Sequence, residues 1–180
     1  MLRLLATHRV DWVMTGSTVL ALYGADLTPN DLDVTPHLEP SNLQRLADAL
    51  HEIEAIPAFL PDWQEDFTID HCRAWRPVPA TAEQLDYLFV TRLGMLDVPP
   101  RLCGTYDELM PSARRVDIGD CQVTVCEPDE ILRRLEGRTR PKDLDRAAAY
   151  QWIRAQPSTH RRPTGVDGLL ARLAHRESLS

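Results

Sequence analysis

Residues 11–36 read DWVMTGSTVLALYGADLTPNDLDVTP and hold the densest chemical signal in the chain. A short apolar run leads into Gly16, a second apolar run follows it, and Gly24 closes that second run. Glycine permits a sharp backbone turn, Ser17 or Thr18 is a residue type that caps helix starts, and glycine commonly ends helices. The pattern therefore predicts a strand, a tight turn and a helix, and the N–H groups at such a helix start suit a phosphate.

The second half of this stretch places two carboxylates close together. Residues 30–34 alternate polar and apolar side chains after a turn-forming Thr-Pro-Asn. On a strand, Asp31 and Asp33 would share one face with their Cα atoms about 6.5–7 Å apart. Two like charges so close together are unfavourable unless a cation offsets them, and carboxylate oxygens suit magnesium or manganese. The alternative is a solvated acidic turn beside an ordinary capped helix.

Both halves together carry a family resemblance. Thr15-Gly16-Ser17, thirteen intervening residues and then Asp31-Leu32-Asp33-Val34 resemble the signature of the nucleotidyltransferase superfamily that includes polymerase beta. The resemblance implies an α/β fold in which helices flank a twisted mixed β-sheet, with a small helical C-terminal tail. It also implies transfer of a nucleoside monophosphate from a nucleoside triphosphate, such as ATP, to a hydroxyl or phosphate acceptor. Gly16 and Ser17 would then seat the triphosphate.

A third carboxylate on a neighbouring strand belongs to the pattern that this resemblance implies. Asp97 is the first choice because it is an isolated acid between apolar neighbours, in Leu-Asp-Val; Asp70 and Asp86 are its competitors. The resemblance then makes Asp31, Asp33 and Asp97 both the catalytic residues and the ligands of Mg²⁺ or Mn²⁺. Such paired ions stabilise the entering and leaving oxygens of an in-line displacement.

A second block resembles one branch of this superfamily, the abortive-infection type toxin nucleotidyltransferases and their uncharacterised relatives. The matching residues are Gly137-Arg138 and Lys142-Asp143, which follow an acidic segment. The resemblance implies that Arg138 and Lys142 offset the charge of the triphosphate. One departure is that Arg133 or Arg134 stands where such relatives often carry lysine, so a delocalised guanidinium replaces a compact ammonium. The alternative for this block is that its charges complement helix dipoles.

Composition limits the partners. The chain of 180 residues has a formal net charge of −7, which argues against sequence-independent coating of DNA by a basic surface. It has no apolar run long enough to cross a bilayer and no signal-peptide pattern near its start, so we expect a cytoplasmic protein that does not contact the membrane. The four cysteines show no Cys-x-x-Cys spacing, which favours reduced thiols over a zinc site.

The remaining sequence predicts one nucleotidyltransferase domain over residues 1–155, followed by a linker and a short C-terminal helix over 156–180 with little order of its own. Trp63 and Trp75 lie in a proline-rich part, where packing under a loop is favoured over a base-stacking platform. Further elements are expected as helices at 1–8, 41–54 with Ser41 as cap, 105–110, 128–135, 141–155 and 165–177, and as strands at 67–70, 86–93, 95–98 as a sheet edge, 114–118 and 122–125.

Three alternatives for the function stay open. A toxin-like enzyme would modify tRNA or protein and would be controlled by an antitoxin partner, as the branch resemblance implies. An antibiotic-type enzyme would modify a small molecule with the same catalytic residues. A non-catalytic domain of the same fold would bind a nucleotide without turnover, and a missing third carboxylate would favour it.

Overall fold

The computed structural model describes residues 1–60, 68–136, 141–145, 147–157, 163 and 167. Its helices are α1 (Leu2–Thr7), α2 (Gly16–Leu22), α3 (Pro40–Glu52), α4 (Ile69–Ala74), α5 (Ala82–Leu85), α6 (Tyr106–Leu109), α7 (Pro128–Leu135), α8 (Pro141–Asp145) and α9 (Ala147–Ala155). Its strands are β1 (Trp12–Thr15), β2 (Asp31–Pro36), β3 (Ile56–Pro57), β4 (Leu88–Thr91), β5 (Gly94–Asp97), β6 (Arg114–Ile118) and β7 (Cys121–Val125).

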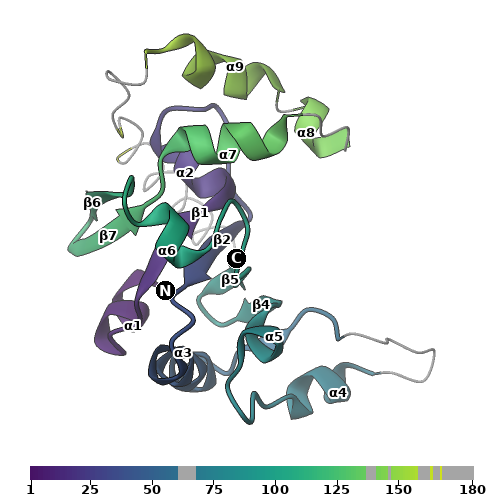
Figure 1. The fold of residues 1–180 in the computed structure, drawn as a ribbon. Coiled ribbons are helices and arrows are strands. Elements are labelled where there is room, and N and C mark those ends of the chain that lie inside the picture. The colour runs from purple at the N-terminus through teal and green to yellow at the C-terminus, as the bar shows by residue number, and fades with distance from the viewer. Residues whose placement is uncertain (61–67, 137–140, 146, 158–162, 164–166, 168–180) are drawn as a thin grey trace.

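The described strands form one mixed sheet in the order β3-β4-β5-β2-β1-β7-β6. Parallel pairing joins β2 to β5 and β1 to β7, whereas the other neighbouring strands are antiparallel. The architecture is α/β, with helices beside a mixed sheet, as the sequence predicts. Figure 1 shows α2 and α7 towards one end of the molecule and α3, α4 and α5 towards the other.

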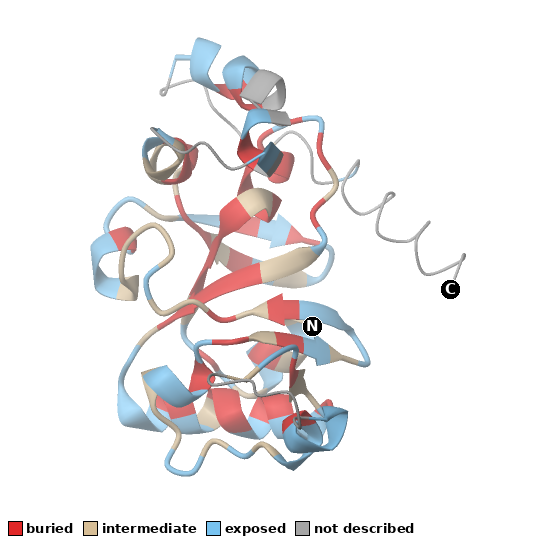
Figure 2. Cartoon of the chain, turned by 90° about the vertical axis from the view of Figure 1, so that its right-hand side faces the viewer, coloured by how far each residue is buried: buried red, intermediate tan, exposed pale blue. Residues whose placement is uncertain are grey.

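Two apolar clusters hold these elements together. One joins β1 and the β6–β7 hairpin to α2, α7 and α9, and the other joins α3 to β2, β4 and β5. Helix α3 shows how the sequence produces this packing, because Leu43, Leu46, Ala47 and Leu50 recur at helical spacing and are all buried. Figure 2 shows the buried residues concentrated along the central strands and the inner sides of the helices.

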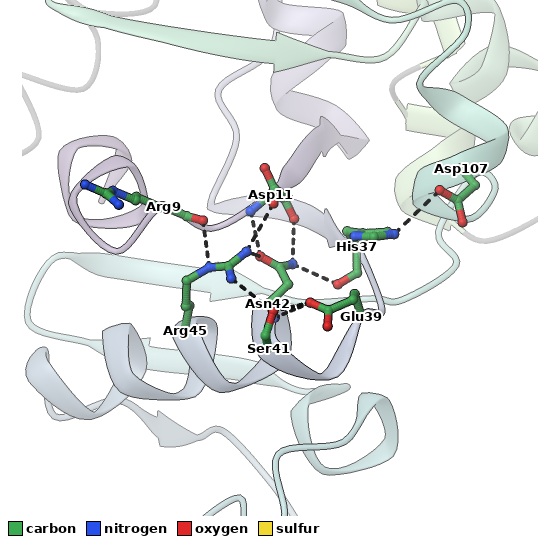
Figure 3. Close-up of polar contacts among 8 residues, drawn as sticks. All are labelled: Arg9, Asp11, His37, Glu39, Ser41, Asn42, Arg45 and Asp107. Carbon is green, nitrogen blue, oxygen red and sulfur yellow. Dashed lines mark hydrogen bonds and ion pairs between the residues drawn. The ribbon is translucent and has the colours of Figure 1, made fainter.

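A buried asparagine joins α3 to the paired strands β1 and β2 (Figure 3). The side chain of Asn42 is fully buried, and its amide nitrogen donates to the carbonyl oxygens of Asp11 and His37 at 2.9 and 2.8 Å. Its amide oxygen accepts from the backbone N–H of Asp11 at 2.7 Å and from the Arg45 guanidinium at 3.0 Å. Asp11 precedes β1 and His37 follows β2, so one side chain fixes where the pair begins and ends.

Most predicted elements are present, and three details away from the β1–α2 turn are wrong. Residues 69 and 70 begin helix α4 instead of ending a strand. Strand β5 lies between β4 and β2 and is not a sheet edge. Helix α3 is capped by Glu39, whose side chain accepts from the backbone N–H of Asn42, and not by Ser41. Proline at position 40 favours this earlier start because its ring suits the first turn of a helix.

Other predictions are confirmed or lie outside the described residues. The packing role of Trp75 is confirmed, since its ring lies 5.1 Å from that of Phe89 and 6.2 Å from that of Tyr87. Trp63 lies outside the described residues, as does nearly all of the predicted helix over 165–177. The helix expected over 141–155 is described as α8 and α9. Among the described residues, no helix has the combination of length and apolar character that crossing a bilayer requires.

Candidate functional site

The turn from β1 into α2 has the geometry that its glycine predicts, but a different cap. Gly16 has a φ of 69°, in the left-handed region that favours glycine. Thr15 is the N-cap residue and makes no side-chain capping bond, so neither Ser17 nor Thr18 acts as the predicted cap. The Thr18 hydroxyl instead donates to the carbonyl oxygen of Asp31 at 3.1 Å. This bond fixes the start of α2 against the start of β2.

A carboxylate packs directly against that turn. A Cβ atom built on Gly16 would lie 1.9 Å from Oδ2 of Asp33 and 2.8 Å from its Cβ. Any larger residue at position 16 would therefore displace the Asp33 side chain. The backbone N–H of Ser17 donates a hydrogen bond to the same carboxylate. The glycine is required both by its φ and by the close approach of Asp33.

Three carboxylates occupy one face of the sheet next to this turn. In the parallel pairing of β2 with β5, Asp33 lies opposite Asp97 and Asp31 lies opposite Met95. Residues in register on neighbouring strands share a face, as do residues two apart on one strand. Asp31, Asp33 and Asp97 therefore project from the same face, which is where the sequence predicts the third carboxylate.

The electrostatics of this group centre on Asp33, which is only 8% exposed. Burial, and after it the neighbouring charges of Asp31 and Asp97, raise its pKa to about 7. The Ser17 N–H and the positive charge of Arg134 act in the opposite direction. A carboxyl group with this pKa lies in a place that disfavours its charge, which is a feature typical of functional sites.

The two competitors for the third position lie elsewhere. Asp70 is in the first turn of α4, where it is exposed and pairs with Arg73 at 3.0 Å. Asp86 is the residue that ends α5, ahead of β4, and partial burial raises its pKa. Asp97, by contrast, lies opposite Asp33 in the register, and its charge raises the pKa of Asp33. The register thus separates three sequence candidates that periodicity alone could not.

Two residues near the carboxylates were not identified from sequence with any certainty. Between the adjacent arginines of α7, Arg133 is exposed and pairs with Glu130 at 2.8 Å, whereas Arg134 acts on Asp33. Cys103 interacts with Arg134 and accepts a hydrogen bond from the backbone of Gly16. The sequence indicates that Arg133 or Arg134 takes this position, but it does not show which of the two faces Asp33. Cys103 had no signal, because its neighbours are distant in sequence.

Arg138 lies outside the described residues, and Lys142 lies in α8 with no side-chain placement described. The structure therefore leaves the predicted contact of these two residues with a triphosphate as a prediction. At the predicted triphosphate seat, the backbone groups of Gly16 and Ser17 are bonded to Cys103 and Asp33. A triphosphate at these groups would replace protein contacts.

The donor set of the three carboxylates fits a hard divalent cation, because all the ligands are oxygens and a cation would offset the repulsion at Asp33. In the described part of the chain, no three or more His, Cys, Asp and Glu side chains are already gathered closely enough to hold a metal ion. Binding would therefore require the side chains to move together on strands that already share a register.

Compared with known proteins, the sequence matches no family model and no curated protein.

Proposed function

We propose that this protein is a metal-dependent nucleotidyltransferase that moves a nucleoside monophosphate from a nucleoside triphosphate to a hydroxyl-bearing acceptor. The observation that carries the proposal is the placement of Asp31, Asp33 and Asp97 on one sheet face, with Asp33 buried and its pKa raised to about 7. A solvated acidic turn, the alternative from sequence, would leave its carboxylates exposed. An exposure of 8% at Asp33 opposes that alternative.

The carboxylates would hold the cations, Mg²⁺ or Mn²⁺. Asp31 and Asp33 would contribute to both sites, and Asp97 would complete the site nearer the acceptor. When bound, the two ions would offset the charge of the phosphates and lower the pKa of the acceptor hydroxyl. Deprotonated Asp33 is required for this role, so cation binding and loss of its proton are linked.

Residues on the α2 side would position the nucleotide. Arg134 already contributes positive charge next to Asp33 and is the described cation best placed to meet a phosphate. Gly16 and Ser17 would offer backbone N–H groups once their present contacts are exchanged. Arg138 and Lys142 would add further positive charge, as the sequence predicts.

The proposed reaction is a single displacement at the α-phosphorus. The acceptor oxygen forms a bond to that phosphorus as the bond to the oxygen bridging the α- and β-phosphates breaks. Pyrophosphate leaves with the electron pair of the broken bond, and the hydroxyl proton passes to solvent. Atoms and charge balance without an oxidant, a reductant or a further co-reactant.

The test measures the melting temperature of the purified protein with and without each nucleoside triphosphate and millimolar Mg²⁺ or Mn²⁺. Ligand at about 100 times its Kd adds about 2.7 kcal/mol to the stability of a protein, which raises the melting temperature by roughly 5–10 °C for a chain of this size. Asp33→Asn and Asp97→Asn should each abolish the rise. Asp70→Asn, which removes an exposed carboxylate elsewhere, serves as the matched control and should retain it.

A second measurement separates catalysis from binding. Release of pyrophosphate and transfer of label from an α-³²P triphosphate into cell extract should occur with the native protein and not with Asp33→Asn. A full melting-temperature rise in Asp33→Asn would remove the carboxylates from the site. A rise in the native protein without label transfer into any fraction would favour the non-catalytic domain.

A further inference from the structure

The sheet face that carries the carboxylates continues across β5 and β4 as an apolar surface. Met95 pairs in register with Asp31, Val90 pairs with Met95, and Leu88 pairs with Asp97. The backbone N–H of Ala58, just after β3, donates to the carbonyl oxygen of Leu88 at 2.7 Å. We name these four residues, Ala58, Leu88, Val90 and Met95, the apolar shelf.

The two faces of this hairpin differ sharply in burial. Phe89 and Leu96, which point to the opposite face, are fully buried. On the shelf, Val90 is 43% exposed and Met95 is 37% exposed. The face of an antiparallel sheet that meets water normally carries polar side chains, and this one carries aliphatic side chains beside two carboxylates. Binding sites for small molecules combine apolar side chains with a few polar groups, and here the aliphatic side chains lie next to the carboxylates of the proposed site.

The strand order indicates which ligand. Helix α2 and its Gly16 turn follow β1, on one side of β2, whereas β5 and β4 lie on the other side of β2. The nucleotide would bind on the α2 side, where the backbone N–H groups and Arg134 lie. The shelf then lies on the side from which an acceptor reaches Asp97.

The chemistry of the shelf selects among acceptors. Residues 86–98, DYLFVTRLGMLDV, contain a single basic residue, Arg92, in the β4–β5 turn. A nucleic acid acceptor needs several cations along its backbone. The shelf has one residue on β5, two on β4 and Ala58 just after β3, and it measures about 10 Å across the strands by 7 Å along them. That area suits a small molecule and is well below the roughly 800 Å² that each partner buries in a stable protein complex.

We propose that the apolar shelf binds the acceptor, and that the acceptor is a hydroxyl-bearing small molecule with an apolar or aromatic face. This inference rests on the proposed nucleotidyl transfer and narrows it to small-molecule modification. The apolar face of the acceptor packs on Val90 and Met95, and its hydroxyl lies next to Asp97.

Methionine methyl groups provide the test, because the four methionines of the chain lie in contrasting places. Met95 is on the shelf, Met110 is equally exposed at 37% on the end of α6, and Met14 is buried. In the full-length protein labelled with ¹³C-methyl methionine, titration with naphthalen-2-ylmethanol should shift the Met95 resonance. The change in chemical shift should saturate as the probe concentration rises. The resonance of Met110 should stay in place, and a ten-nucleotide single-stranded RNA should not shift Met95.

A matched pair of variants tests whether the shelf itself binds the probe. Val90→Thr keeps the shape of the side chain and removes part of its apolar surface, so the probe should bind about threefold to fivefold more weakly. Val78→Thr makes the same change at an 83% exposed residue that is not part of the shelf, and it should leave probe binding unchanged.

Several outcomes would overturn the inference. It fails if the probe leaves Met95 unmoved, if RNA shifts Met95, or if the Met95 resonance depends on protein concentration, which would mean that a second copy covers the shelf. If nucleotide raises the melting temperature but the probe does not shift the Met95 resonance, only the proposed role of the shelf is contradicted. A probe response with no nucleotide response in that assay removes the nucleotidyl transfer and leaves the shelf without an acceptor role.

Discussion

A buried polar side chain lies at each end of the paired strands β1 and β2. The two side chains differ in whether the protein supplies favourable partners for them. At one end, neutral Asn42 uses its amide nitrogen and oxygen in hydrogen bonds to Asp11, His37 and Arg45. At the other end, Asp33 is buried beside the charges of Asp31 and Asp97, and its pKa is raised to about 7. One end of the same strand pair therefore stabilises the fold, and the other destabilises it.

This contrast separates a structural polar group from a functional one. Buried polar side chains with all their partners make a fold specific and stable. A buried cluster of like charges has no such benefit, and it persists where a ligand compensates for it. Asn42 on α3 and Asp33 on β2 lie at opposite ends of one strand pair, and they differ in whether the surrounding protein offsets the cost of their burial. The difference comes from what each end is placed to bind.

The largest expected effect is at the site end, from Gly16→Ala. The new Cβ would clash with Asp33, and alanine would have to adopt the left-handed φ of Gly16. We therefore expect a loss of about 2–5 kcal/mol in the free energy of unfolding, from strain and overpacking together. Gly119→Ala is the matched control, because Gly119 has a φ of 62° with nothing within 4 Å of an added Cβ. It should lose only about 1–2 kcal/mol.

Denaturant unfolding measures both variants. The Gly16→Ala protein should also lose the melting-temperature rise with magnesium and nucleotide, although all three carboxylates remain. Equal stability of the two alanine variants would show that the approach of Asp33 to Gly16 is not a tight constraint.

At the other end, Asn42→Leu should lower the free energy of unfolding by about 2–4 kcal/mol, because the backbone groups of Asp11 and His37 lose their partners in a buried place. Gln44→Leu, on the same helix, removes an exposed bond to Asp48 and should change stability by no more than about 0.5 kcal/mol. Urea unfolding of the two variants would compare them. Magnesium and nucleotide should still raise the melting temperature of a folded Asn42→Leu protein. Loss of this rise would mean that Asn42 also supports nucleotide binding at the Asp33 end.

Much of the fold could be predicted from sequence because its signals are local. The run from Trp12 to Gly24 predicted β1 and α2, and the alternation around Gly119 predicted the β6–β7 hairpin. The family resemblance implied a third carboxylate, the apolar neighbours of Asp97 made it the first choice, and the register places it opposite Asp33. What local signals could not show is that β5 inserts between β4 and β2, since strand order depends on contacts between distant segments.

Two of the misses share that cause, whereas the third, at the start of α4, is local. No sequence pattern marks Asn42 as a structural residue, because its partners are up to 31 residues away. The choice of Arg134 over Arg133 depended on which side of α7 faces Asp33. At Ile69, a β-branched residue favoured a strand by propensity, yet Thr68 and His71 form a capping box that begins α4.

The smallest effect is the most specific test of the comparison, because it reads the charge at Asp33 directly. The pKa of Asp33 is raised from its usual 3.8 to about 7 in the folded protein. Between these pH values the folded state holds a proton that the unfolded chain has lost, so the free energy of unfolding falls as pH rises from about 4 to about 7. From pH 5 to pH 8, without divalent cations, the contribution of this group should be on the order of 2–3 kcal/mol.

Other groups titrate in the same range, so the measurement is the difference between the native protein and Asp33→Asn in urea unfolding at pH 5 and pH 8 with EDTA. The asparagine cannot ionise, so its variant should lose less stability across this interval and should be the more stable of the two at pH 8. Asp97→Asn should fall between them, because it removes one charge that raises the pKa of Asp33 and leaves the burial that raises it most. Identical pH dependence in all three proteins would mean that Asp33 is ionised at pH 5 in the folded state. The burial of Asp33 would then cost the fold no more than the burial of Asn42 does.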